Sequence, residues 1–345
     1  MAVAGGGKMK AAVVKEFGKP LSIESVDIPS PSPSQILIKV VSSGVCHTDL
    51  HAAEGDWPVK PKLPLIPGHE VVGKVVQVGS QVDFLKKGDT VGIPWLYCAC
   101  GRCEYCIDGM ETLCPSQLDT GYFVNGGYAE YAVAEANYVA RVPDNIDIYG
   151  VAPIFCAGVT VYKGLKETQI RPGQWVVISG VGGLGHVAIQ YAKAMGMHVA
   201  AVDVTDEKLD MAAKLGAEVR VNASKQDPVE YIQRTIGGAH GVLIAAASMK
   251  AYEQAVGMVR RRGVVVCIGL PPGTFPLSVF EIVLKGVTVK GSIVGTRKDL
   301  QEAIAFAAEG KVKVHYRKEP LENINSVLEQ MKQGKIQGRV VLCLE

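Results

Sequence analysis

A glycine-rich turn constrains the fold of this chain more than any other feature. The turn follows the apolar run WVVISG directly and opens a helical stretch, and its residues are Gly180, Gly182, Gly183, Leu184 and Gly185. In a turn of this kind the first glycine permits the tight bend, the second lets a phosphate approach the backbone, and the third lets helix and strand pack closely. The pattern therefore predicts a strand, turn and helix that hold an anion at the helix N-terminus.

The sequence around this turn alternates between strand and helix patterns. Runs typical of buried strands are WVVISG, HVAAVD, EVRVN, GVLIAAA, GVVVCIG and GVTVKGSIV, with helical stretches such as LGHVAIQYAKAM and DEKLDMAAKL between them. Parallel strands need crossover helices of this length. The alternation predicts an α/β fold whose second part is a doubly wound parallel sheet.

Asp203 turns the glycine pattern into a prediction of a dinucleotide. It ends the strand after the turn, where an acid accepts hydrogen bonds from the adenosine ribose hydroxyls. Its carboxylate would repel the 2′-phosphate of NADP and no arginine adjoins it, so NAD is favoured. Lys208 is a candidate second contact to the ribose, although a lone surface lysine is more often only solvated. The alternative interpretation is an ordinary glycine-rich turn.

The length and the strand pattern predict more than one domain. A chain of 345 residues exceeds the usual size of a single core. Short β-branched runs separated by proline and glycine make residues 1–152 a mainly β domain, residues 153–293 form the parallel sheet, and residues 294–345 are expected to return to the first domain.

Charge and hydropathy exclude several classes of partner. The net charge of +2 comes from 36 basic and 34 acidic residues that are mixed along the chain, so no basic stripe predicts nucleic acid binding. The opening MAVAGGGKMK lacks the apolar run of a secretory signal, and no stretch approaches the ~20 apolar residues of a membrane helix. We expect a cytoplasmic protein without membrane or nucleic acid partners.

The cysteines indicate metal ligation. Cys100, Cys103, Cys106 and Cys114 lie in one short loop with two successive Cys-x-x-Cys spacings. Four thiols at such spacings can enclose a tetrahedral zinc ion, and a filled coordination sphere makes such an ion structural. Four unrelated buried cysteines are the alternative. The remaining cysteines outside this loop and outside the segments GVCHTDLH and IFCAG are interpreted as small hydrophobic residues: Cys98, Cys267 and Cys343.

A second set of ligand types is scattered along the chain. The segment GVCHTDLH contains Cys46, the segment PGHE contains His69, and the segment IFCAG contains Cys156. Spacing alone does not bring these three residues together. A lone histidine is more often a satisfied polar side chain, and a lone cysteine is more often a core residue.

Several motifs in this order resemble one family. GVCHTDLH, PGHE, the four-cysteine loop, CAGVTVYK and the glycine turn cover nearly the whole chain. Together they resemble the zinc-dependent alcohol dehydrogenases of the medium-chain dehydrogenase/reductase superfamily, and best the tetrameric yeast and bacterial branch that is active on ethanol. The resemblance implies a GroES-like β-rich catalytic domain, a Rossmann cofactor domain, NAD, two zinc ions per chain and a homotetramer.

The resemblance also implies roles for the scattered ligands. Cys46, His69 and Cys156 would hold a catalytic zinc and leave its fourth position open. Asp49 would orient His69 by accepting its second ring N–H, as metal-bound histidines commonly require. Glu70 matches an acidic residue that lies behind the metal in this family. A surface salt bridge is the alternative for either acid.

Two further residues of GVCHTDLH match a proton relay. A zinc-bound alcohol has a lowered pKa, so its proton must leave near neutral pH. By resemblance, Thr48 takes this proton and His51 receives it near the surface through the nicotinamide ribose, because an imidazole titrates close to neutral pH.

The remaining matches concern cofactor and substrate. By resemblance, His47 and Arg339 contact the cofactor pyrophosphate and Thr160 contacts the nicotinamide. Trp57 and Trp95 match bulky residues that narrow the alcohol pocket, although core packing is the commoner place for tryptophan. Two indoles beside the metal favour small, unbranched primary alcohols such as ethanol and the matching aldehydes.

Three alternatives carry different sequence requirements. A zinc-free quinone or enoyl reductase of the same superfamily would lack the cysteine and histidine ligands, which are present here. A polyol dehydrogenase usually has an acid in place of Cys156. A non-catalytic scaffold or sensor that binds zinc or NAD would not need both Thr48 and His51.

Overall fold

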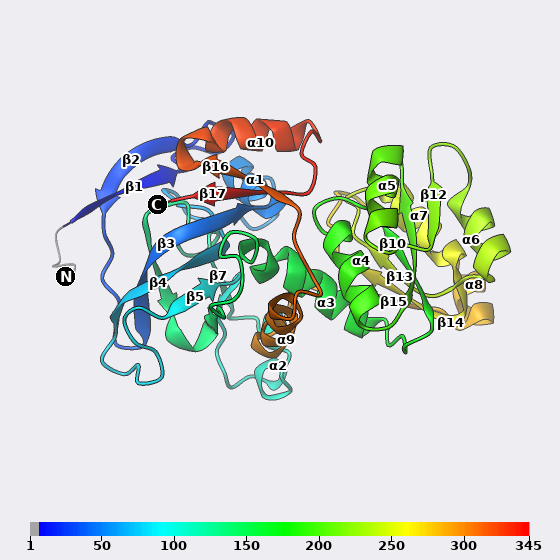
Figure 1. The fold of residues 1–345 in the computed structure, drawn as a ribbon, viewed down its shortest axis with the longest axis horizontal. Coiled ribbons are helices and arrows are strands. Elements are labelled where there is room, and N and C mark those ends of the chain that lie inside the picture. Colours follow the sequence, from blue (N-terminus) through cyan, green and yellow to red (C-terminus); the bar gives the residue numbers. More distant parts are fainter. Residues whose placement is uncertain (1–6, 345) are drawn as a thin grey trace. The chain divides into compact units, whose positions relative to one another are not determined.

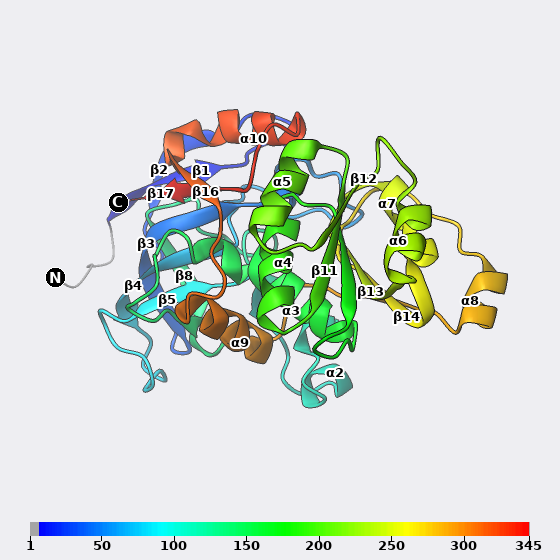
Figure 2. The same cartoon turned by 45° about the vertical axis from the view of Figure 1, so that its right-hand side comes forward.

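The chain divides into two compact units in a computed structural model that describes residues 7–344. Unit 1 comprises Met1–Cys156, Thr296–Ala308 and Val314–Glu345, and unit 2 comprises Ala157–Gly295 and Glu309–Lys313. Each unit is built around its own sheets, which are shown in Figures 1 and 2.

Unit 2 contains a six-stranded sheet in which every neighbouring pair is parallel. Its order is β12-β11-β10-β13-β14-β15, so the chain winds outward from β10 in one direction and then from β13 in the other. In such sheets ligands bind at the carboxyl ends of the strands where the order reverses. The strands are β10 (Trp175–Ser179), β11 (His198–Asp203), β12 (Val219–Asn222), β13 (Ala239–Ile244), β14 (Val259–Cys267) and β15 (Thr288–Gly291).

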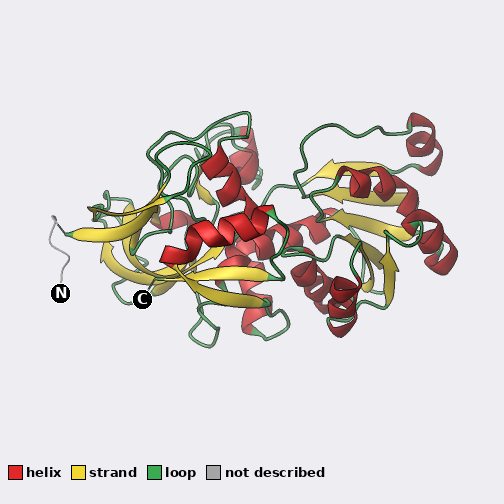
Figure 3. Cartoon of the chain, turned by 90° about the horizontal axis from the view of Figure 1, so that it is seen from above, coloured by secondary structure: helices red, strands yellow, loops and turns green. Residues whose placement is uncertain are grey.

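Helices cover both faces of this sheet. Figure 2 shows α4 and α5 on one side of it and α6 and α7 on the other, and Figure 3 shows the same layering from above. Apolar strand side chains such as Val177 and Val242 are fully buried beneath α6 and α7. The helices are α3 (Ala157–Glu167), α4 (Gly185–Ala194), α5 (Asp206–Lys214), α6 (Pro228–Ile236), α7 (Met249–Met258) and α8 (Val279–Lys285).

Helix α6 shows how the sequence sets these elements. Asp227 caps its start by accepting the backbone N–H groups of Val229 and Glu230, and Pro228 occupies the first turn, where it loses no hydrogen bond. Gly237 ends the helix with a φ of 67°, a left-handed conformation that glycine adopts without strain. Ile232 is fully buried and fixes the helix to the sheet.

Unit 1 is mainly β. Its larger sheet has the order β16-β17-β3-β4-β5-β9, with β8 paired to β3, and two smaller sheets pair β1 with β2 and β6 with β7. The strands are β1 (Lys8–Val13), β2 (Ser22–Asp27), β3 (Gln35–Val45), β4 (Glu70–Val78), β5 (Thr90–Ile93), β6 (Leu96–Cys98), β7 (Leu118–Asp119), β8 (Tyr131–Glu135), β9 (Ala140–Arg141), β16 (Tyr316–Pro320) and β17 (Arg339–Cys343).

The C-terminal strand closes this sheet beside an N-terminal one. β17 pairs antiparallel with the far end of β3, as the red and blue ribbons show in Figure 1. The same end of β3 leads into α1 (His47–Glu54). The remaining helices of unit 1 are α2 (Glu104–Ile107), α9 (Arg297–Ala308) and α10 (Ile324–Lys332), with short 3₁₀ turns η1 (Glu111–Leu113), η2 (Ala136–Tyr138), η3 (Ala152–Phe155) and η4 (Leu321–Asn323).

The predicted fold class is confirmed: a β-rich unit is joined to a doubly wound parallel sheet. In the part of the chain that the structure describes, every helix is too short or too polar to cross a bilayer.

Candidate active site and metal centres

The scattered ligands lie at the ends of three secondary-structure elements that meet in unit 1. Cys46 follows β3 and caps α1, His69 precedes β4, and Cys156 follows η3. One ligand atom from each of these residues and from Glu70 lies within 4.8 Å of the others, and all four side chains are buried. The structure thus assembles a set that spacing along the chain could not establish.

The hydrogen bonds of His69 fit this set to a metal ion. Its Nδ1 lies 2.8 Å from Asp49 Oδ1, so the ring donates there and its Nε2 is left with a lone pair. Nε2 is buried without a hydrogen-bond partner. A buried lone pair beside two thiols is the donor arrangement of a site with one imidazole and two thiolates, which suits zinc.

Asp49 holds this part of the site together. Its Oδ1 accepts from Gly68 N at 3.1 Å as well as from His69, and its Oδ2 accepts from Cys46 N at 2.9 Å and from the hydroxyl of Tyr128 at 2.8 Å. The bond to Cys46 N closes the first turn of α1, because Asp49 is its third residue. One carboxylate therefore fixes a thiol ligand, an imidazole ligand and the start of a helix.

The two buried thiols differ in acidity. A hydrogen bond from Cys156 lowers the pKa of Cys46 well below its ordinary value, with a further contribution from His69. The same hydrogen bond and burial raise the pKa of Cys156. Burial alone would lower the pKa of His69, yet its contacts with Asp49 and Cys46 raise it. Cys46 is the group that most readily supplies a thiolate, the form that binds metals.

Glu70 forms a fully buried ion pair with Arg339, the first residue of β17. Burial raises the pKa of Glu70 to about 7 and Arg339 acts in the opposite direction. Glu70 Oε2 and Arg339 Nε have no hydrogen-bond partner. The structure thus places Arg339 against Glu70 at 4% exposure, and its predicted contact with a pyrophosphate stays a prediction.

Helix α1 carries the three polar residues that follow Cys46. Thr48 Oγ1 lies 3.9 Å from Cys46 Sγ. His51, one turn further, has a side chain that is 27% exposed, and its Nδ1 lies 2.9 Å from Asp56. His47 is exposed, although partial burial of its ring lowers its pKa. Thr48 and His51 therefore extend from the ligand set toward the surface, as the predicted relay requires.

Aromatic rings form a wall beside His69. Trp95 packs edge-on against the imidazole with ring centroids 5.1 Å apart, and Trp57 packs against Trp95 at 6.3 Å. Tyr122 completes the wall at 5.3 Å from Trp57 and 5.8 Å from Trp95, and its hydroxyl donates to Val59 O at 2.6 Å. We name Trp57, Trp95 and Tyr122 the aromatic wall. Bulky rings beside the ligand set restrict the size of a substrate.

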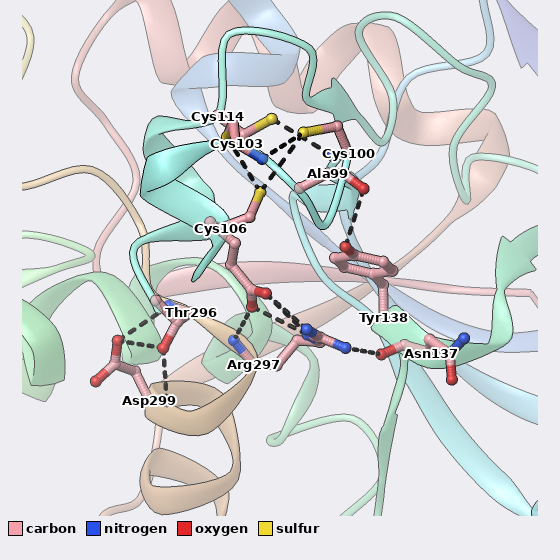
Figure 4. A network of polar contacts seen from close by, with 11 residues as sticks. Ala99, Cys100, Cys103, Cys106, Cys114, Asn137, Tyr138, Thr296, Arg297 and Asp299 are labelled. Carbon is pink, nitrogen blue, oxygen red and sulfur yellow. Dashed lines mark hydrogen bonds and ion pairs between the residues drawn. The ribbon is translucent and has the colours of Figure 1, made fainter. Parts of the chain in front are cut away.

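The four-cysteine loop forms a second candidate metal centre in unit 1, shown in Figure 4. The Sγ atoms of Cys103 and Cys106 are 3.5 Å apart and those of Cys100 and Cys106 are 4.0 Å apart. A tetrahedron with metal–sulfur bonds of ~2.3 Å has edges of about 3.8 Å, so these separations fit a zinc ion. The backbone N–H groups of Arg102 and then of Cys103 lower the pKa of Cys100 to about 6. No disulfide joins any of the cysteines in residues 7–344.

The glycine turn in unit 2 has the geometry that a bound phosphate needs. Gly180 has a φ of 95°, and a Cβ at Gly185 would lie 1.8 Å from Gly180 O, so these two positions require glycine. A Cβ at Gly182 would meet nothing within 4 Å, which leaves its backbone open to a ligand. Gly183 and Leu184 complete the turn before α4. The turn leads directly into the N-terminus of α4, where backbone N–H groups favour an anion.

Asp203 closes the turn from the neighbouring strand. Its Oδ2 accepts from Val181 N at 2.7 Å, and its Oδ1 accepts from Val204 N at 2.8 Å. Lys208 Nζ lies 3.7 Å from Oδ1. Thr160 is buried in α3 of the same unit. The carboxylate is thus fixed beside the turn by backbone N–H groups, and its role as a ribose acceptor stays a prediction.

Comparison with known proteins settles the family. Residues 32–144 match the family described as Alcohol dehydrogenase GroES-like domain, and residues 183–309 match Zinc-binding dehydrogenase. An alcohol dehydrogenase of Moraxella sp. (strain TAE123) is 61% identical over 334 residues, which cover 97% of this chain and 99% of the relative. The chain belongs to the zinc-dependent alcohol dehydrogenase family. The predicted resemblance is confirmed.

Solved alcohol dehydrogenases and their relatives share the fold. The alcohol dehydrogenase of the archaeon Aeropyrum pernix is 34% identical with a TM-score of 0.90, covering 97% of this chain and 99% of that one. The acetophenone reductase of Geotrichum candidum, solved in complex with NAD, is 28% identical with a TM-score of 0.87, covering 97% of both chains.

The structure adds residues that the sequence did not indicate for this dehydrogenase. Tyr122 lies in the aromatic wall, and Tyr128 donates to Asp49. Asp119 is 5% exposed with Oδ1 unpartnered, and burial raises its pKa to about 7, with His69 acting in the opposite direction. Only the glycine before each tyrosine, in GGY and TGY, offered a local signal, and glycine-tyrosine pairs are too common to single out a site.

Proposed function

We propose that this member of the family oxidises small primary alcohols to aldehydes, reversibly, with NAD as the hydride acceptor and zinc at two sites. The observation that carries the proposal is the buried set of Cys46, His69 and Cys156, in which His69 Nε2 has no partner, next to the aromatic wall. A buried nitrogen without a hydrogen-bond partner costs free energy, and a purely structural core has no reason to bear that cost.

Cys46, His69 and Cys156 would hold the catalytic zinc, which supplies a Lewis acid that lowers the pKa of an alcohol hydroxyl, and NAD supplies the hydride acceptor. Asp49 orients His69 through Nδ1. Glu70, paired with Arg339, places a buried acid beside the same ligand atoms. The protein residues thus fix the donors before substrate binds.

Thr48 and His51 carry away the proton that the alcohol loses. The hydroxyl of Thr48 lies beside Cys46 and both accepts and donates, so it takes this proton and passes one on. His51, held by Asp56 and partly exposed, releases the proton to solvent.

The cofactor site follows from the glycine turn and Asp203. We propose that the turn holds the pyrophosphate and that Asp203 accepts the ribose hydroxyls, with Lys208 beside it. Residues 204–206 after Asp203 contain no arginine that could accept a 2′-phosphate, which favours NAD over NADP. His47 and Thr160 keep their predicted contacts with the pyrophosphate and the nicotinamide. A relative of 28% identity was solved with NAD.

We also propose which residues form the catalytic domain and which form the cofactor domain. Residues 1–152 and 294–345 would form the catalytic domain and residues 153–293 the cofactor domain, with Cys156, just past the first boundary, completing the catalytic zinc site of Cys46 and His69. The structural zinc would be held by Cys100, Cys103, Cys106 and Cys114. A cytoplasmic location stays a prediction from the sequence.

The function is tested by the initial rate of NADH formation with NAD and a series of alcohols, after zinc has been counted by mass spectrometry. We expect two zinc ions per chain, turnover of ethanol and 1-propanol, and much lower kcat/KM for 2-propanol and for NADP. Preference for secondary or bulky aromatic alcohols would contradict the assigned role of the aromatic wall. Two bound zinc ions and NADH binding without turnover of any alcohol or aldehyde would favour a scaffold or sensor.

Unit 2 carries a face that fits a second copy of this chain. Val279, Phe280 and Val283 on α8 are 74%, 74% and 69% exposed, and β15 is the last strand of its sheet. An open strand edge pairs with its own copy about a two-fold axis, and apolar side chains next to it favour such pairing. We propose that this face contributes to the predicted homotetramer.

Negative charge introduced on this face is expected to dissociate the predicted homotetramer. A Phe280→Asp and Val283→Asp double variant places two carboxylates in the proposed interface, and their desolvation opposes association. Sedimentation velocity should show a smaller species than the wild type, with secondary structure unchanged by circular dichroism. Lys250→Asp, an exposed change on α7, is the control. A double variant that sediments like the wild type would place the interface elsewhere.

A further inference from the structure

A single arginine contacts the four-cysteine loop from a distant part of the chain. Arg297, at the start of α9, donates its backbone N–H to Glu111 Oε1 at 2.8 Å and its Nε to both carboxylate oxygens at 3.1 and 3.0 Å. Its terminal nitrogen lies 2.8 Å from Oε2. Glu111 lies within the loop, three residues before Cys114, and Cys114 N donates to its carbonyl at 3.2 Å. Arg297 thus holds the C-terminal end of the loop through Glu111.

The same guanidinium reaches the other end of the loop through Tyr138. It lies 4.6 Å from the centroid of the tyrosine ring and donates to Asn137 O at 3.3 Å. The hydroxyl of Tyr138 donates to Ala99 O at 3.2 Å, and Ala99 precedes Cys100. Figure 4 shows Tyr138 joined to Ala99 and Arg297 joined to Asn137, the residue before Tyr138. Both ends of the loop are therefore tied to one cation.

Burial distinguishes this ion pair from an ordinary surface salt bridge. The Glu111 side chain is 8% exposed although that of Arg297 is 47% exposed, whereas pairs exposed on both sides contribute little to stability. A buried carboxylate needs its partner, because removing that partner leaves an uncompensated charge. Arg297 supplies the partner twice, with its backbone N–H and with a bidentate fork that lysine cannot reproduce.

We infer that Arg297 is a positioning residue for the four-cysteine metal centre, because it braces both ends of the loop from Cys100 to Cys114. The inference rests on the proposed function only in that zinc occupies this loop. Partners that orient metal ligands typically change metal affinity by about 10- to 100-fold when they are removed.

The test follows each cysteine separately in the zinc-loaded enzyme. Iodoacetamide alkylation in the presence of a chelator, read by peptide mass spectrometry, reports how fast each ligand thiol is released. Arg297→Gln should accelerate alkylation of the four loop cysteines about tenfold and leave Cys46 and Cys156 at the wild-type rate. Arg297→Lys keeps the charge and loses the fork, so it should lie between the two.

Two further variants keep the test decisive. Arg141→Gln is the matched control, because Arg141 in the same unit pairs with Asp89 at 2.9 Å, that carboxylate is 10% exposed, and neither residue lies in the loop from Cys100 to Cys114. It should leave every alkylation rate unchanged. Tyr138→Phe removes only the hydroxyl that holds Ala99 and should accelerate the loop cysteines by about threefold, even if Arg297→Gln fails to fold.

Other outcomes would overturn the inference. Wild-type rates at the loop cysteines in Arg297→Gln, or in Tyr138→Phe where only that variant folds, would remove the bracing role. Equal acceleration at all ligand cysteines would indicate general destabilisation. Zinc counting in the wild type separates these results from a failure of the metal site itself, because a loop without zinc in the wild-type enzyme would contradict the proposed function first.

Discussion

Replacing Thr48 by alanine is expected to lower kcat for ethanol oxidation by about a hundredfold or more, while the zinc content stays at the wild-type level. The hydroxyl lies 3.9 Å from Cys46 Sγ and is not a metal ligand, so its loss removes proton transfer without removing the metal. Positioned groups of this kind typically contribute a factor of about 10² to 10⁴. Steady-state rates of NADH formation, with zinc counted on the same samples, measure both quantities.

Thr48→Ser is the matched control because it keeps the hydroxyl and loses only a methyl group. It should retain most of the wild-type rate. An alanine variant within a few fold of the wild type would show that the alcohol loses its proton by another route, such as ordered water. A loss of zinc in the alanine variant would instead assign Thr48 a part in holding the site.

Local patterns made the glycine turn and the four-cysteine loop predictable. Gly180 and Gly185 are both required by one bend, and Cys100 to Cys114 lie in one loop. The residues that form each candidate site are therefore close together in the sequence. The strands of unit 2 were also predictable, because burial on both faces produces continuous apolar runs. In each case the physical constraint acts within a short stretch of chain.

Contacts across the chain were beyond such patterns. Glu70 and Arg339 are 269 residues apart, and Glu111 and Arg297 are 186 residues apart. Glu70 and Arg339 meet because β17 pairs with the end of β3 and β3 with β4, and no periodicity encodes which arginine finds which acid. The family resemblance therefore indicated Arg339 as a pyrophosphate contact but gave no sign of its buried partner Glu70.

The catalytic ligand set lies between these two cases. Cys46, His69 and Cys156 belong to three separate elements, so only the family resemblance joined them before the structure did. The aromatic wall shows the same division. Trp57 and Trp95 were indicated by resemblance, but Tyr122 was not, because a ring in a loop acquires a role only from the residues that fold against it.

Asp49→Asn is expected to empty the catalytic zinc site while the four-cysteine loop keeps its metal. Asp49 is 1% exposed and accepts four hydrogen bonds, two on each oxygen, so no water can replace a lost acceptor. An asparagine must turn its NH₂ group toward one of the two pairs of donors. Affinity at this site should fall by about 10- to 100-fold, and dialysis against a chelator should leave one zinc per chain.

Each orientation of the amide disturbs the site in a different way. If its NH₂ group faces His69 and Gly68, the imidazole must move its proton to Nε2, and that nitrogen then has no lone pair for a metal. If it faces Cys46 and Tyr128, the tyrosine hydroxyl can rotate to accept, but the backbone N–H of Cys46 cannot, so the start of α1 loses its bond.

Tyr128→Phe tests whether the effect of Asp49→Asn comes from the Asp49 carboxylate itself or from the loss of any one of its hydrogen bonds. It removes one donor and leaves both carboxylate oxygens of Asp49 free to hold Cys46 and His69, so the variant should keep both zinc ions. An asparagine variant that also keeps both, with a wild-type rate of zinc release, would show that the three ligands bind the metal without Asp49. Retention by Tyr128→Phe and loss by Asp49→Asn would assign the effect to the negative acceptor itself, because only the second change removes it.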